Sequence, residues 1–350
     1  MKLFNTPIIF IIFNRPAVTK RVFEVIRKMQ PTRFFIAADG PRYPLKKEYE
    51  LCEQTRAIVE QIDWPCDLQL LFNEQNMGCG KAVSRAITWF FQQVEEGIVL
   101  EDDCLPSEDF FFFCEELLAH YRHDSRVTTI CGSTLLNKKY AHIPGHYLGN
   151  SNGVWGWATW RRAWALYDFE IKKINDPLVK ERIRKTLGND IVFPYVIDTF
   201  NLLLSGKFDT WDIQWYFAGL SNGGRAVCPF QNMISNIGHD GAHDQGKNRL
   251  HDRPVFPLDR SRITEPCSNA DLVKEAELFH YKFHLIYPKN LFLWHIQQRA
   301  FCMYEKTVIA LLGRRPVRLE GYISAVRWHL KRLGRKVIYR AAVFLRARGS

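Results

Sequence analysis

The first hundred residues alternate between short apolar runs and segments with helical spacing, and this alternation limits the fold more than any other feature. The first run, Ile8 to Phe13, is apolar without interruption, as in a strand buried on both faces. Strands are predicted over residues 7–13, 33–38, 67–72 and 97–100. Helices are predicted over 17–29, over 46–62 and from the turn at 76–80 through residue 93. Such alternation is typical of βαβ units. We therefore expect an α/β fold, a mostly parallel Rossmann-like sheet flanked by helices.

Polar residues follow each predicted strand directly. They are Asn14 and Arg15 after the first strand, Asp39 and Gly40 after the second, residues 73–76 after the third, and residues 101–103 after the fourth. The carboxyl ends of parallel strands meet at one edge of a sheet, and ligands bind there. The sequence therefore predicts one site to which all four strands contribute.

Three successive acids after the fourth strand give this site its chemistry. Side chains alternate in direction along an extended chain, so Glu101 and Asp103 are predicted to face one way and Asp102 the other. Two like-facing carboxylates favour a divalent cation, and oxygen ligands suit Mn²⁺ or Mg²⁺. The alternative is that the acids are solvated or cap the next helix, although Ser107 and Asp109 can cap it themselves. We prefer the metal interpretation because solvated acids do not need a buried strand before them.

Four stretches carry a resemblance to a known family. They are the E-D-D motif at 101–103 with its P-x-x-D-F-F continuation, the opening strand with its N-R-P turn, the D-G pair at 39–40, and the stretch G-V-W-G-W-A-T-W at 153–160. Together they resemble the N-acetylglucosaminyltransferase I family and its bacterial relatives of the GT-A type, over roughly residues 5 to 245. The resemblance implies a GT-A fold and a nucleotide-sugar donor. It also implies that Asp103 is the direct metal ligand and that Asp39 contacts the base or ribose.

Further residues are candidates for holding the donor. The turn at 76–80 places two glycines before a helix, so its backbone amides, with Asn76 and Lys81, are predicted to meet a phosphate. The alternative is a plain turn that starts a helix, and the spacing is not that of a P-loop. Arg15 is a second candidate for the pyrophosphate or the base. Glu101 and Asp102 are assigned to the same nucleotide-sugar site.

An acid near residue 212 is the candidate catalytic base. The stretch W-D-I-Q-W at 211–215 resembles the family's W-D-x-x-W motif, in which the acid before the helix is the base. Inverting transfer needs a group that removes the proton of the acceptor hydroxyl. The resemblance therefore assigns this role to Asp212, with Asp209 second. The alternative is that either acid only caps the following helix.

A histidine and three tryptophans complete the predicted site. His243, with His239 second, is a candidate metal ligand in a glycine-containing loop, and the alternative is a loop histidine with no ligand. Trp155, Trp157 and Trp160 are predicted to be platforms on which sugar rings stack, although a single tryptophan is more often part of a core. We assign Trp157 to the donor site.

The C-terminal segment concentrates the positive charge of the chain. Residues 312–350 contain eleven Arg and Lys against one acid, a net charge of +10 out of +11. Apolar residues recur there at helical spacing, which predicts an amphipathic helix for an anionic membrane face. A helix packed on the body and a nucleic-acid site are the alternatives, and no nucleic acid is expected because no recognition motif accompanies the charge. We expect a transferase domain over 1–250 and a helical basic extension over 251–350.

These observations predict a divalent-metal-dependent inverting glycosyltransferase, which moves a sugar from a nucleotide diphosphate, by default UDP, to a glycan or lipid-linked acceptor, as in polysaccharide biosynthesis. The nine cysteines include no C-x-x-C pair and no metal-ligand spacing, and no signal peptide is apparent, so a cytoplasmic location is expected, with peripheral contact to the membrane. A retaining transferase, a nucleotidyltransferase and a non-catalytic glycan-binding module remain as alternatives.

Overall fold

The computed structural model describes residues 4–136, 138–150, 153–190, 192–206, 208–239 and 253–284. These residues belong to one compact unit, Met1–Leu285, and residues 286–350 make up a second unit outside the described part. The predicted basic helix and His243 therefore lie outside the described residues. The domain boundary at residue 250 stays a prediction.

The first half of the sheet is parallel, as the alternating pattern predicts. Its elements are β1 (Ile8–Ile12), α1 (Pro16–Met29), β2 (Arg33–Ala38), α2 (Lys46–Arg56), η1 (Ala57–Gln61), β3 (Asp67–Phe72), α3 (Cys79–Gln93) and β4 (Glu96–Glu101). The strands lie in the order β3, β2, β1, β4, and Ile8 is level with Phe34 on one side and Ile98 on the other. Every residue of β1 is buried, as its uninterrupted apolar sequence requires.

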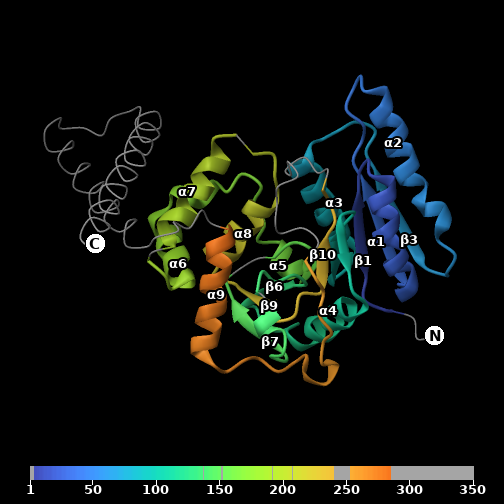
Figure 1. Ribbon diagram of the computed structural model, residues 1–350. Coiled ribbons are helices and arrows are strands. Elements are labelled where there is room, and N and C mark those ends of the chain that lie inside the picture. The colour runs from blue at the N-terminus through green and yellow to red at the C-terminus, as the bar shows by residue number, and fades with distance from the viewer. Residues whose placement is uncertain are drawn as a thin grey trace, which may run out of the picture. The chain divides into compact units, whose positions relative to one another are not determined.

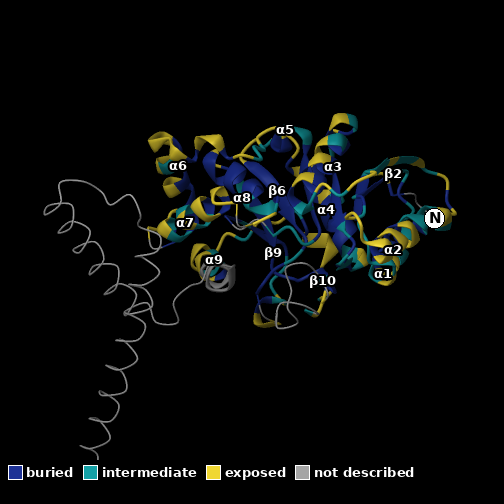
Figure 2. Cartoon of the chain, turned by 90° about the horizontal axis from the view of Figure 1, so that it is seen from above, coloured by how far each residue is buried: buried dark blue, intermediate teal, exposed yellow. Residues whose placement is uncertain are grey.

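The connections decide which helices cover which face. The chain steps in one direction from β1 to β2 to β3, so right-handed crossovers place α1 and α2 on the same face. It returns in the other direction from β3 to β4, which places α3 on the opposite face (Figure 2). Because these four strands are parallel, their carboxyl ends lie along one edge of the sheet (Figure 1).

The second half of the sheet contains two reversed strands that the sequence did not predict. Its strands are β6 (Val127–Cys131), β7 (His146–Gly149), β8 (Trp157–Trp160) and β9 (Arg225–Pro229). β8 runs antiparallel between β4 and β6, and β7 runs antiparallel beside β9 at the edge. A separate ribbon pairs β5 (Cys104–Pro106) with β10 (Ile234–Asn236). The ribbon ties the chain just after Asp103 to the chain just before Gly238.

Helices and short 3₁₀ turns complete the unit. They are α4 (Glu108–His120), η2 (Lys138–Tyr140), α5 (Arg161–Trp164), η3 (Lys172–Asn175), α6 (Pro177–Leu187), α7 (Phe193–Leu204), α8 (Asp212–Ser221), η4 (Arg260–Arg262) and α9 (Ala270–His284). Phe110, Phe111 and Phe113 of α4 are fully buried, so this helix is part of the core. No helix in the described ranges has both the length and the apolar character needed to cross a membrane.

A cluster of tryptophans fixes the start of α8 against the sheet. The ring of Trp157 stacks on that of Trp211 with centroids 5.6 Å apart, and lies 5.5 Å from the ring of Trp215. Trp164 adds a further ring 5.2 Å from Trp215. All four indoles are at most 5% exposed, and packed aromatic pairs stabilise beyond the area they bury. The packing therefore holds residues 211–215 at a defined place beside β4 and β8.

Candidate functional site

The acids at the end of β4 are divided between the interior and the site. Asp102 is buried, and its carboxylate accepts hydrogen bonds from the Arg15 guanidinium and, at 3.4 Å, from the backbone N–H of Phe13. Arg15 Nη1 also lies 3.1 Å from Oδ2 of Asp103. Arg15 therefore bridges Asp102 and Asp103, and its contact with a nucleotide stays a prediction.

Glu101 differs from the other two acids in its contacts within the described part of the chain. Among the described residues, its carboxylate makes no hydrogen bond or ion pair. Burial raises the pKa of Glu101 well above its ordinary value, and the charges of Asp103, Asp102 and Asp212 raise it further. A partly buried carboxylate among other acids is stabilised by a cation.

The donor atoms present fit Mn²⁺ or Mg²⁺, which prefer oxygen ligands. In the described chain, no three His, Cys, Asp or Glu side chains come together as a ready-made metal site. One or two carboxylates are enough for a metal that shares its remaining positions with water and substrate phosphates. Glu101 and Asp103 are the residues that would hold it.

A glycine loop packs directly on the acids. A Cβ added at Gly238 would lie 2.4 Å from Oδ2 of Asp103 and 2.9 Å from Nη1 of Arg15, so a larger residue there would displace these two side chains. The backbone N–H of Ile237 donates to the carbonyl of Asp103 at 2.8 Å. His239, which follows Gly238, is exposed, and its role as a metal ligand stays a prediction.

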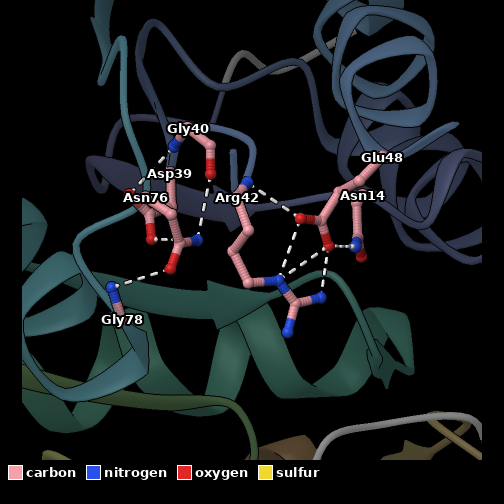
Figure 3. Close-up of polar contacts among 7 residues, drawn as sticks. All are labelled: Asn14, Asp39, Gly40, Arg42, Glu48, Asn76 and Gly78. Atoms are coloured by element: carbon pink, nitrogen blue, oxygen red, sulfur yellow. Dashed lines mark hydrogen bonds and ion pairs between the residues drawn. The ribbon is translucent and has the colours of Figure 1, made fainter. Parts of the chain in front are cut away.

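Asp39 organises the turns that follow β2 and β3 (Figure 3). Its carboxylate accepts hydrogen bonds from Asn76 Nδ2 and from the backbone N–H of Gly40, both at 2.9 Å. It also accepts from Asn73 Nδ2 at 3.1 Å and from the backbone N–H of Met77 at 3.0 Å. Asn76 also accepts from the N–H of Gly78 at 3.2 Å. Asp39 and Asn76 thus lie together at the predicted edge. Their contact with a nucleotide stays a prediction.

A second network beside it was missed by the sequence analysis. Glu48 is 6% exposed and accepts from Asn14 Nδ2 at 2.8 Å and from the backbone N–H of Arg42 at 2.8 Å (Figure 3). Its hydrogen bonds with the Arg42 side chain lower the pKa of Glu48. The sequence offers no signal for it, because one Glu in the first turn of a helix usually faces solvent.

The amides at the start of α3 have a protein partner, which corrects the phosphate prediction for this turn. The backbone N–H groups of Cys79 and Gly80 each donate to the Asp209 carboxylate at 2.8 Å. A phosphate cannot occupy these donors while Asp209 holds them. Lys81 is exposed one residue further along α3, and its contact with the donor stays a prediction.

Asp212 lies at the start of α8, close to the acids of β4. Its Oδ1 accepts from Thr210 Oγ1 and, at 2.9 Å, from the backbone N–H of Ile213. In the part of the chain that the structure describes, Oδ2 of Asp212 has no hydrogen-bond partner. The capping alternative thus accounts for one oxygen and leaves the other able to accept a proton.

The thiol of Cys79 lies among these carboxylates. Burial, together with the negative charges of Glu101, Asp209, Asp212 and Asp103, raises the pKa of its thiol to about 12. The acids come from two segments more than a hundred residues apart in the sequence. The fold therefore brings the predicted metal and base residues to one place.

The tryptophans predicted as sugar platforms need correction. Trp157 and Trp160 are 0% and 2% exposed because they lie on β8 in the middle of the sheet. Rings without accessible surface cannot stack on a sugar, so the assignment of Trp157 to the donor site is wrong. Trp155, just before β8, is only partly buried, and its role stays a prediction.

A cavity of about 570 Å³ lies away from these acids, beside the edge strand β7. It is lined by Leu148 of β7, Gly188 after α6, Arg225 of β9, and Lys274 and Glu277 of α9. None of the predicted site residues that the structure describes lines it. The carboxylate site and this cavity are therefore separate features of the unit.

Comparisons with known proteins give only distant likenesses. No family model matches the chain, and no curated protein matches it. Among solved structures, HddC from Yersinia pseudotuberculosis is 10% identical, covering 49% of this chain and 85% of its own, with a TM-score of 0.29. A 4-diphosphocytidyl-2C-methyl-D-erythritol synthase from Anaerococcus prevotii is 8% identical (67% and 94% covered, TM-score 0.32). An apo UDP-glucose pyrophosphorylase is 10% identical (65% and 93% covered, TM-score 0.30).

Proposed function

We propose that this chain is an inverting, divalent-metal-dependent glycosyltransferase that takes a sugar from a nucleotide diphosphate, with UDP as the first candidate. One observation carries the proposal. Glu101, Asp103 and Asp212 gather at the carboxyl end of β4, where Glu101 and one oxygen of Asp212 have no partner among the described residues. Ligands bind at this edge of a parallel sheet.

The residues divide the chemistry between them. Glu101 and Asp103 would hold Mn²⁺ or Mg²⁺, which neutralises the charge that develops on a departing diphosphate. Arg15 keeps Asp103 in place through its ion pairs. The acceptor hydroxyl oxygen attacks the anomeric carbon as the bond to the diphosphate oxygen breaks. Asp212 Oδ2 takes the hydroxyl proton, and a nucleoside diphosphate leaves. The acceptor is a glycan or a lipid-linked hydroxyl.

Calorimetric titration with UDP, GDP, CDP and dTDP, each with Mn²⁺ and with EDTA, tests the proposal. We expect one nucleotide to bind only with the metal, and Asp103→Ala to weaken this binding at least about 10-fold through loss of a ligand. Asp63→Ala is the matched control, because Asp63 is an exposed acid paired with Arg27 and precedes β3, at the edge of the sheet opposite the site. If none of the four nucleotides binds in the presence of Mn²⁺, the proposal is wrong.

The products separate transfer from its alternatives. Release of a nucleoside diphosphate from a donor sugar, with inversion at the anomeric carbon, supports the proposal. Retention of configuration would assign a retaining transferase. Release of pyrophosphate from a nucleoside triphosphate would assign nucleotidyl transfer instead. Glycan binding that is unchanged in Asp103→Ala, without any turnover, would point to a binding module.

A further inference from the structure

Asp209 joins two parts of the site that are far apart in sequence. Its carboxylate comes from the segment before α8, and it accepts from the first two backbone N–H groups of α3, those of Cys79 and Gly80, both at 2.8 Å. These donors have no partner within their own helix, and the positive end of the helix favours an anion. Asp209 therefore caps a helix that lies about 130 residues earlier in the chain.

Two glycines make room for this contact. Gly78 has a φ of +82°, and a Cβ at that position would lie 2.6 Å from Oδ2 of Asp209. A Cβ at Gly80 would lie 2.6 Å from the carbonyl oxygen of Thr210. The positive φ disfavours any other residue at Gly78, and a Cβ at Gly80 would meet backbone, which cannot turn aside as a side chain can. The two glycines of the turn thus allow the Asp209 carboxylate and its segment to approach the start of α3.

The contact continues directly into Asp212. The Thr210 hydroxyl donates to Oδ1 of Asp212, and the Thr210 carbonyl accepts from Gln214 Nε2 at 2.8 Å. The carbonyl of Trp211 accepts from the hydroxyl of Tyr167 at 3.2 Å. Residues 209–212 are therefore held by α3 on one side and by the tryptophan cluster on the other.

We propose that Asp209 is a positioning residue, which locks the segment carrying Asp212 onto the start of α3 and so sets the distance from Asp212 to Glu101 and Asp103. This inference rests on the proposed function, in which Asp212 removes the acceptor proton. It assigns Asp209 no contact with the substrate. Asp209, the second candidate for the base, thus supports Asp212 instead of acting as the base itself.

The test compares Asp209→Ala and Asp209→Asn with Asp176→Ala. Asp176 is a matched control, because it caps α6 by accepting from the N–H of Leu178 at 2.8 Å and takes no part in the site. We expect amide hydrogen exchange to rise at residues 79–80 and 210–213 in Asp209→Ala only. The kcat should fall about 10- to 100-fold in Asp209→Ala, with nucleotide Kd within about 2-fold, because misplacement of a base slows the chemical step. Asp209→Asn keeps an acceptor oxygen and should recover part of the kcat.

Each result decides the matter. If exchange at residues 210–213 is unchanged in Asp209→Ala, the lock does not exist. If exchange rises while kcat stays at the level of Asp176→Ala, the positioning role is overturned. If the unsubstituted chain neither binds nucleotide nor transfers sugar, the proposed function fails and the catalytic purpose of the lock fails with it. The exchange difference is measured in every case, so the two failures can be told apart.

Discussion

At the scale of single residues, the identity of the site acids was predictable and their partners were not. The buried strand followed by three acids was enough to predict Glu101, Asp102 and Asp103 at the sheet edge. The sequence could not show that Arg15 pairs with two of them, because that contact joins residues 87 positions apart. Asp102 is buried, so removal of Arg15 would leave its charge without a compensating partner. Arg15 is therefore needed to stabilise the site itself.

His146 supplies a prediction about acid stability. It is fully buried, its Nδ1 donates to the carbonyl of Ile263 at 2.9 Å, and its Nε2 accepts from the Tyr121 hydroxyl at 2.7 Å. Burial lowers its pKa from 6.5 to about 4. The unfolded chain therefore takes up this proton first as pH falls. The free energy of unfolding therefore has its full value above about pH 6.5. It falls by up to about 3 kcal/mol as the pH approaches 4.

Urea unfolding at pH 7 and pH 4.5 checks this expectation. His146→Gln should lose less stability between the two pH values than the unsubstituted chain. The exposed His142→Gln is the control and should keep the original dependence. An equal decline in all three proteins would assign the acid sensitivity to other groups.

At the scale of elements, the parallel strands were predicted closely and the reversed ones were not. β2 and β3 have the predicted bounds. The apolar run of β2 is buried, as in a central parallel strand, whereas β3 is the edge strand and none of its residues is fully buried. β8 is only four residues long and follows two glycines and a tryptophan. Its strand conformation comes from antiparallel pairing with β4 and β6, a long-range effect that local pattern does not contain. The sugar-platform error arose for this reason.

The turn after β2 gives a prediction at this scale. A Cβ at Gly40 would lie 2.5–2.6 Å from the backbone N and Cα of Gln75, in the turn that Asp39 holds together. Backbone cannot move aside as a side chain can, so Gly40→Ala should reduce the free energy of unfolding by about 1–3 kcal/mol. Gly153→Ala is the control, because its nearest neighbour is the Ser133 hydroxyl at 3.2 Å. Equal urea midpoints for the two variants would contradict the expected clash.

At the scale of the whole molecule, charge is separated along the chain. Residues 312–350 carry almost all of the net charge of +11, and we propose that they bind an anionic membrane. Co-sedimentation of the full chain with phosphatidylglycerol vesicles should be strong at low salt and weak with neutral phosphatidylcholine vesicles. Arg332→Gln, Arg335→Gln and Lys336→Gln together should reduce it, at about 1 kcal/mol for each charge near the surface. Binding that ignores both lipid charge and these substitutions would overturn the proposal.

The order of the strands has a consequence for how the chain can change. Residues 8–101 form the four neighbouring strands β3, β2, β1 and β4, and the reversed β8 is the border at which the later strands begin. Each side of this border is nearly continuous in sequence. Insertions or exchanges after residue 106 can therefore remodel one side of the molecule while the other keeps its register. A chimera built at this border, with residues 209–212 and 234–238 retained because they contact α3, β5 and Asp103, would test whether the first four strands keep their register.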